Sequence, residues 1–168
     1  MKYSFVTGLL LLISLSVVAQ NNPGDSCRYI KVDAGYLVVL RQGDTVFKQL
    51  EKIALKERIP AANFSGMGFL SHVRFGFFNS ITKEFEPKEF MNVELASLTG
   101  SIAWEAGQVS LHLHGVAGDK QMQTYGGHIL SAVVGTGSLE ILLVIHQQKL
   151  ERKTDPAISA KVLQIPCQ

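Results

Sequence analysis

Apolar positions recur at helical spacing in one clear stretch of the chain. Between Val46 and Ile59, apolar side chains lie three or four positions apart, and lysines and glutamates fall between them. This pattern predicts an amphipathic helix that covers one face of a sheet. Asp44 stands where it can cap the start of the helix, and Pro60 is expected to end it.

Most of the remaining pattern is typical of strands. Apolar runs are bounded by Gly and polar residues, and residues 109–116 alternate apolar and polar side chains without interruption. Strands are expected at residues 36–40, 62–70, 73–78, 93–104, 109–116, 128–134 and 139–145, with a hairpin or long loop over 79–89. The pattern therefore predicts one α+β domain, an α/β sandwich with a mainly antiparallel sheet and one long flanking helix.

The N-terminal segment has the organisation of a signal peptide. Lys2 forms a minimal positive region, an apolar stretch follows, and Ala19 ends a plausible cleavage site. The apolar stretch is short for a spanning helix, which needs about 20 residues, although an uncleaved anchor is the alternative. We expect a signal peptide over 1–19, a polar leader over 20–28 and a domain over 29–165. The mature protein would then be periplasmic or extracellular, with no membrane span.

Composition and charge narrow the class of protein. Hydrophobic residues make up 46% of the 168 and charged residues 18%, which excludes a disordered chain, a coiled coil and a collagen-like chain. Removal of Lys2 with the signal peptide leaves 15 basic against 14 acidic side chains. The densest basic stretch, Lys149 to Lys153, is interrupted by Leu150 and Glu151. This near-neutral balance argues against nucleic acid as a partner.

The two cysteines lie near the ends of the mature chain. Cys27 is close to the expected N-terminus and Cys167 is the next-to-last residue. An oxidising compartment would allow a disulfide between them that joins both ends of the domain. Two free or intermolecular thiols are the alternative, because sequence does not give the separation of the two residues.

Three histidines form the strongest candidate site. His112 and His114 stand two apart in an expected strand, so their side chains leave the same face about 6 to 7 Å apart. His128 is expected to begin the next strand after Gly126-Gly127, and a hairpin-like return could bring it beside the first pair. Imidazole is the commonest protein ligand of divalent metals, and three such ligands leave an open coordination position. Zinc is the expected metal. The alternative is a polar trench or subunit interface.

No recognised catalytic motif accompanies this cluster. Glu94 could serve as a general base or as a hydrogen-bond partner behind the histidines, and Arg74 could pair with a carboxylate or an anionic ligand. For both residues an ordinary exposed side chain of a strand is the favoured interpretation. The sequence leaves open whether the protein is an enzyme. His72 and His146 have no companion at ligand spacing and are expected to be ordinary histidines.

The residues around the histidines resemble a known family signature. Leu111–Val116, Gly118-Asp119 and Tyr125–Leu130 are similar to the signature of the PPC ("plants and prokaryotes conserved") domain, which is also found in plant AT-hook nuclear proteins. Ser65–Gly68 resembles the bend after the first helix of the family, and Glu94–Ile102 resembles its central strand. The resemblance extends over nearly the whole mature chain.

This resemblance implies a sandwich that assembles as a homotrimer. It also implies a stand-alone prokaryotic member, because the basic AT-hook that contacts DNA in the plant proteins is absent here. An exported, metal- or small-ligand-binding homotrimer is the function that the sequence favours. DNA binding by family analogy and an envelope protein-interaction module are the two alternatives.

Overall fold

The computed structural model describes residues 27–165, so the expected signal peptide and Cys167 lie outside the described residues. One helix and eight strands make up this part of the chain. They are β1 (Tyr29–Val32), β2 (Gly35–Arg41), α1 (Val46–Lys56), β3 (Ala61–Asn79), β4 (Glu84–Glu105), β5 (Gln108–Gly118), β6 (Thr124–His146), β7 (Glu151–Asp155) and β8 (Ala160–Gln164). The predicted α+β class, with one helix and a mainly antiparallel sheet, is confirmed.

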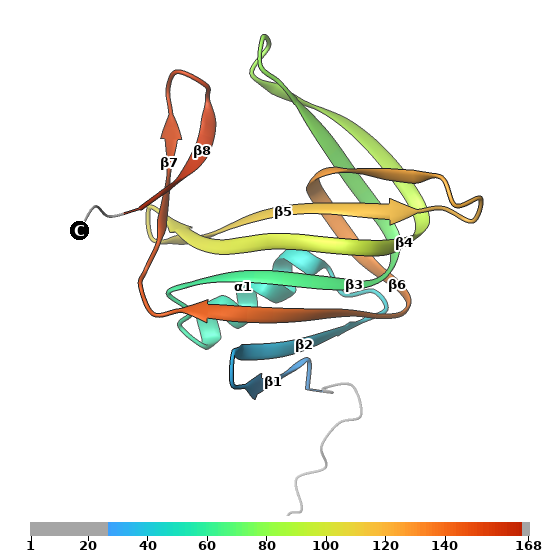
Figure 1. Cartoon of the computed structure of the whole chain (residues 1–168), viewed down its shortest axis with the longest axis horizontal. Coiled ribbons are helices and arrows are strands. Elements are labelled where there is room, and N and C mark those ends of the chain that lie inside the picture. The colour runs from blue at the N-terminus through green and yellow to red at the C-terminus, as the bar shows by residue number, and fades with distance from the viewer. Residues whose placement is uncertain (1–26, 166–168) are drawn as a thin grey trace, which may run out of the picture.

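The strands form one strongly curved sheet (Figure 1). Its order is β1-β2-β6-β3-β4-β7-β8, and β5 pairs with both β4 and β6. The sheet closes on itself over four strands: β3 pairs with β4, β4 with β5, β5 with β6, and β6 again with β3. The pairing of β4 with β7 is parallel and all other strand pairs are antiparallel. This curvature brings the N-terminal part of β6 to the predicted histidine strand.

Helix α1 covers one face of the sheet, as predicted. Its apolar stripe buries Val46, Leu50, Ile53 and Ala54 in the core that strands β2 to β6 form, and the helix contacts β5 and β6 in particular. The helix ends at Lys56, and the chain reaches Pro60 through a short turn. Among the described residues no helix is long and apolar enough to span a membrane.

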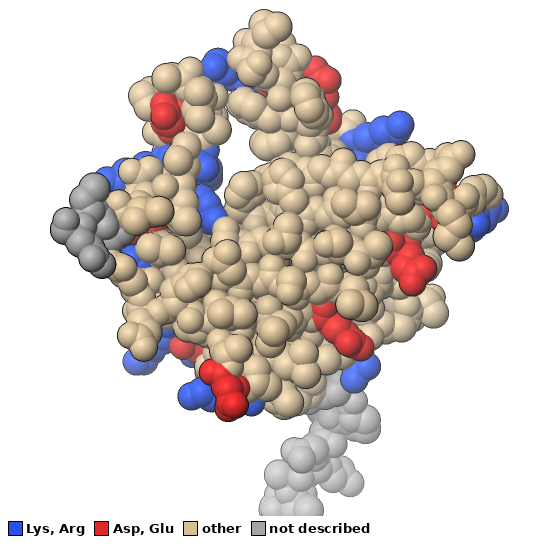
Figure 2. Space-filling view, viewed as in Figure 1, with Lys and Arg blue, Asp and Glu red and all other residues tan. Residues whose placement is uncertain are grey.

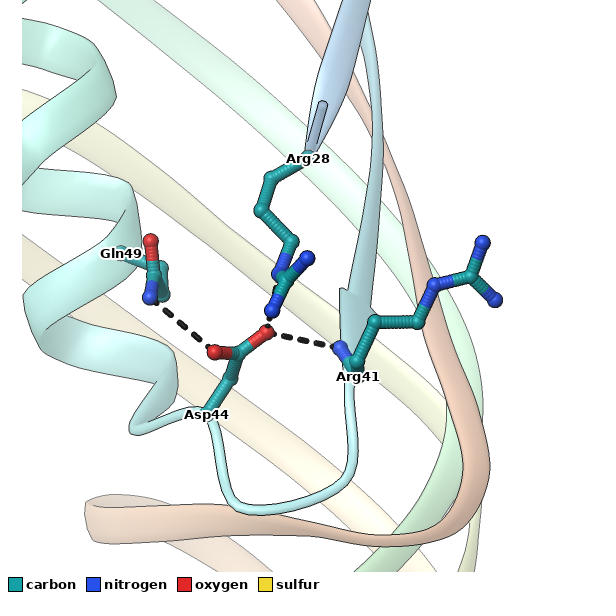
Figure 3. A network of polar contacts seen from close by, with 4 residues as sticks. All are labelled: Arg28, Arg41, Asp44 and Gln49. Atoms are coloured by element: carbon teal, nitrogen blue, oxygen red, sulfur yellow. Dashed lines mark hydrogen bonds and ion pairs between the residues drawn. The ribbon is translucent and has the colours of Figure 1, made fainter. Parts of the chain in front are cut away.

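Asp44 does not cap the helix, contrary to the prediction. Thr45 occupies the N-cap position without a side-chain cap bond, and the Asp44 carboxylate points to the strand before the helix (Figure 3). It accepts hydrogen bonds from Arg28 Nε at 2.7 Å, from the Arg41 backbone N–H at 2.8 Å and from Gln49 Nε2 at 3.1 Å. Asp44 thus ties the residue just before β1 and the end of β2 to the first turn of α1.

Several predicted strands are parts of longer ones. Residues 62–70 and 73–78 both belong to β3, and the pieces expected at 128–134 and 139–145 belong to β6, which also includes Gly135 and Gly137. The bend expected at Ser65–Gly68 is confirmed, because the register of β3 with its neighbours shifts around Gly68. These shifts bend the strands without ending them. Gly135 and Gly137 suggested a break between two strands, but both lie within β6. The short strands β1, β7 and β8 were not predicted.

Two hairpins project from the same side of the sheet (Figure 1). One joins β3 to β4 at the turn that the polar residues 79–89 had suggested, and the other joins β7 to β8. Their tips meet where Lys83 Nζ donates a hydrogen bond to the Ala157 carbonyl at 3.0 Å. The space beneath these tips lies over β5, where the candidate site is found.

Candidate metal centre

The three histidines are brought together by direct pairing of β5 and β6. His114 is opposite His128 in the antiparallel register, and His112 is two residues before His114 on the same strand face. The predicted convergence is therefore confirmed. The local detail differs, because β6 begins at Thr124 and Gly126-Gly127 lie inside the strand; the turn that reverses the chain is at Asp119–Gln123.

Glycines allow this close approach of backbones around the histidines. Gly100 on β4 is opposite Leu113, the residue between His112 and His114 on β5. A Cβ added to Gly100 would lie 2.5 Å from the His112 carbonyl oxygen. A Cβ on Gly126 would lie 2.7 Å from the Gly115 carbonyl. Side chains at these positions would push β5 away from its neighbours. These glycines thus allow β4, β5 and β6 to pack closely around the histidines.

The ring nitrogens of the histidines face one another. His112 Nε2 is 3.2 Å from His114 Nε2, and His128 Nδ1 is 3.4 Å from the same His114 atom. One candidate ligand atom from each residue lies within 4.8 Å of the other two. The ring of Phe85 stacks on His128 with centroids 4.8 Å apart and holds that imidazole in place.

The cluster favours neutral imidazoles. Partial burial, followed by the charges that His112 and His114 would carry, lowers the pKa of His128 to about 4. Burial also lowers the pKa of His112, with smaller contributions from His114 and Arg152. Placing three protonated rings together is unfavourable, and neutral imidazole is the form that binds metal. The lowered pKa values therefore favour the neutral form of the rings, which can donate an electron pair to a metal ion.

The donor set fits a divalent metal. Zinc takes nitrogen ligands at about 2.0–2.1 Å, so two ligand nitrogens of one ion lie roughly 3.3 Å apart, which is close to the shorter separations in this cluster. Three nitrogens of this kind match the ligands of open zinc sites. His112, His114 and His128 would hold the ion, which would supply Lewis acidity at the position left open.

A cavity of about 690 Å³ opens over the histidines. It lies between the two projecting hairpins, and Figure 2 shows the opening beneath their tips, with basic side chains along the edge nearest to β7 and β8. Aromatic residues of the β3–β4 hairpin form one wall: Phe77, Phe78 and Phe85. The histidines are thus reachable by a small molecule.

Arg152 is a functional candidate that sequence reasoning missed. Arg152 comes directly after Glu151, which pairs with Trp104 in the parallel contact between β7 and β4. The residue is buried, with 4% of its surface exposed. Its guanidinium donates hydrogen bonds to the Ser110 carbonyl and to Ser101 Oγ, and the residue lines the histidine cavity. An arginine among other charged residues near the C-terminal end has no periodicity that would mark it as buried, so no signal in the sequence identified it.

The other predicted site residues lie elsewhere. Glu94 is exposed and pairs with Gly118, four residues beyond His114 along β5. Arg74 is on β3, where its Nε is 3.9 Å from Glu89 Oε1. The structure brings neither into contact with the histidines. Cys27 is exposed and its thiol donates a hydrogen bond to the Tyr29 carbonyl at 2.8 Å. Because Cys167 lies outside the described residues, the disulfide between Cys27 and Cys167 remains a prediction.

Comparison with known proteins identifies the family of this fold and site. Residues 28–146 match the Plants and Prokaryotes Conserved (PCC) domain, which is most of the chain. The protein therefore belongs to the PCC domain family, and the resemblance seen in the sequence is confirmed. No curated protein matches the chain.

Solved structures agree with this assignment. A presumed DNA-binding protein from Ralstonia eutropha JMP134 is 49% identical, with a TM-score of 0.81 over 83% of this chain and 96% of that one. A presumed DNA-binding protein from Bacteroides thetaiotaomicron is 27% identical, with a TM-score of 0.76 over 81% and 95%. A metal-containing protein from Archaeoglobus fulgidus is 26% identical, with a TM-score of 0.70 over 77% and 91%.

Proposed function

We propose that this protein binds a divalent metal, zinc in the first instance, through His112, His114 and His128. The observation that carries the proposal is the convergence of three ligand nitrogens within 4.8 Å of one another at the base of an open cavity. The lowered pKa values of His112 and His128 support it, because they keep both rings neutral. The metal-containing relative from Archaeoglobus fulgidus is consistent with the same chemistry.

Metal content of the purified protein tests this proposal. Protein prepared without chelator should contain about one divalent ion per chain by elemental analysis, or should take up one zinc per chain at neutral pH. A variant with all three histidines replaced by alanine should contain none. A wild-type protein that neither contains metal nor takes up zinc would show that the histidines form a polar trench.

We further propose that the protein is a homotrimer. The family resemblance implies this state, and an apolar strip on the sheet face away from α1 supports it. Leu37 lies opposite Leu142 in the pairing of β2 with β6, Val144 follows on the same face, and these side chains are 36%, 39% and 41% exposed. Apolar surface of this kind is commonly covered by a partner.

Light scattering at micromolar concentration should therefore give three times the mass of one chain. Leu142→Lys places a charge in the strip and should yield monomers, whereas Lys48→Ala on the exposed side of α1 should leave the trimer intact. A wild-type protein with the mass of a single chain would remove the support for self-association.

We also propose that the protein is exported and acts in the periplasm or outside the cell, on the basis of its N-terminal sequence. N-terminal sequencing of the mature protein should begin near Gln20. Leu11→Arg interrupts the apolar stretch and should leave the full-length precursor in the cytoplasm. A soluble cytoplasmic wild-type protein that retains Met1 would contradict the proposal.

DNA binding is the second candidate function, and the names of two relatives favour it. A protein that binds through phosphate contacts shows affinity for duplex DNA that falls steeply as salt rises. The near balance of basic and acidic side chains leads us to expect no such binding. A tight complex with duplex DNA that weakens as salt rises would contradict this expectation and support DNA binding as the function.

A further inference from the structure

The cavity over the histidines contains positive charge and no acidic side chain. Arg152 and Lys161 line it together with the histidines, and none of its lining residues, all from the described part of the chain, is Asp or Glu. Glu105 lies just outside and accepts a hydrogen bond from Lys161 at 2.6 Å, so it balances that ammonium group. Glu105 also acts to raise the pKa of Arg152, but burial outweighs it and the pKa is lowered. One carboxylate is thus shared by two cations, and the cavity keeps a net positive charge.

Arg152 is buried without a hydrogen bond or close ion pair to a carboxylate. Both of its hydrogen-bond acceptors, the Ser110 carbonyl and Ser101 Oγ, are neutral, and no ion pair within residues 27–165 includes this side chain. A buried cation is costly unless an opposite charge is supplied. A divalent metal on the three neutral histidines would add two positive charges to the same cavity, so the need for an anion would increase.

The wall opposite these charges is aromatic and open to solvent. Phe77 is 75% exposed and Phe85 is 40% exposed, although both line the cavity. Phe78 packs against Phe85 with ring centroids 5.3 Å apart. Ligand sites typically combine apolar walls with a few polar groups in cavities of about 300–1,000 Å³. The wall therefore suits the apolar part of a small ligand.

We propose that the cavity binds a small organic carboxylate that has an aromatic or branched apolar group. Its carboxylate would offset the net positive charge of the metal, Arg152 and Lys161, and its apolar group would cover Phe77 and Phe85. This inference rests on the proposed metal site and names the class of ligand that the site takes. Inorganic phosphate would match the charge but would leave the aromatic wall exposed.

Calorimetry with zinc-loaded protein tests the inference with phenylacetate as the probe. Acetate keeps the carboxylate without the ring, phenylacetamide keeps the ring without the charge, and phosphate supplies charge alone. We expect phenylacetate to bind at least tenfold more tightly than each of these three. Zinc content is measured on the same samples, so that metal binding and carboxylate binding are assessed separately.

Two variants separate the contributions of charge and wall. Arg152→Gln should weaken phenylacetate binding about tenfold or more, while the zinc content stays at one per chain. Phe77→Ala should weaken the binding of phenylacetate and leave the affinity for acetate unchanged. Because Phe77 is exposed, this variant provides a test even if Arg152→Gln does not fold. Lys48→Ala, on the far side of α1, should change neither affinity.

The outcomes are distinct. Zinc-loaded protein that binds phenylacetate no better than phenylacetamide, or no better than phosphate, would overturn the carboxylate inference and leave the metal site standing. Protein that takes up no zinc would overturn the proposed function and the inference with it. Selective phenylacetate binding that Phe77→Ala weakens would support the inference.

Discussion

His114→Ala should abolish stoichiometric zinc binding. His114 is the central histidine of the cluster, because its Nε2 lies 3.2 Å from His112 Nε2 and 3.4 Å from His128 Nδ1. Loss of an outer partner of a zinc ligand already costs about 10–100-fold in affinity, and loss of a ligand should cost more. Elemental analysis and zinc titration at neutral pH would measure the effect.

His146→Ala is the matched control. His146 lies at the far end of β6, where its Nε2 is 2.8 Å from Asn63 Oδ1 and where no other histidine is near. Its removal should leave one zinc per chain. Equal zinc content in wild type and His114→Ala would contradict the assignment of the histidines as ligands.

Zinc binding should also depend on pH in a defined direction. Protons compete with the metal for imidazole nitrogen, so affinity falls as pH falls. An unperturbed histidine takes up a proton near pH 6.5, whereas the pKa of His128 is lowered to about 4 by burial and by the two neighbouring rings. His112 is shifted in the same direction. Zinc uptake should therefore decline below pH 6.5 more gradually than for an unperturbed histidine site and be lost by about pH 4.

The histidine cluster could be predicted from the sequence because its geometry is local. The spacing of His112 and His114 fixes their common face, and one antiparallel pairing supplies His128. Glu94 and Arg74 could not be placed in the same way, because the position of each depends on the curvature of long strands. Arg152 joins the cavity through the single parallel contact of β7 with β4, which no local pattern indicates.

The fold class could also be predicted, but not the lengths of its strands. The helix has a strong amphipathic pattern that matches its burial, whereas Gly135 and Gly137 within β6 were interpreted as a break between two strands. A bulge and a strand end both place glycine between apolar runs, so the sequence does not distinguish them. The prediction that Asp44 caps the helix was wrong for a related reason. Tertiary contacts decide whether a residue just before a helix caps that helix or forms hydrogen bonds with another element.

Asp44→Asn should destabilise the folded protein by about 2 kcal/mol at neutral pH, because hydrogen bonds to charged groups contribute about 1.5–3 kcal/mol each. The Asp44 side chain is 11% exposed and Arg28 is 24% exposed, so solvent screens their ion pair only weakly. Urea denaturation would measure the change. Asp33→Asn, at an exposed turn, should change stability by less than about 0.5 kcal/mol.

The effect of Asp44→Asn should depend on pH. Burial acts to raise the pKa of Asp44, but hydrogen bonds from Arg28, the Arg41 backbone and Gln49 outweigh it, and the pKa is lowered. A carboxyl group with a lowered pKa in the folded state contributes stability that is complete above its unfolded pKa of about 3.9 and is lost as pH falls through the folded value. The difference between wild type and Asp44→Asn should therefore be full at pH 7 and shrink below about pH 4. A difference that is the same at pH 7 and at pH 2 would show that the carboxylate charge does not stabilise the junction of β1, β2 and α1.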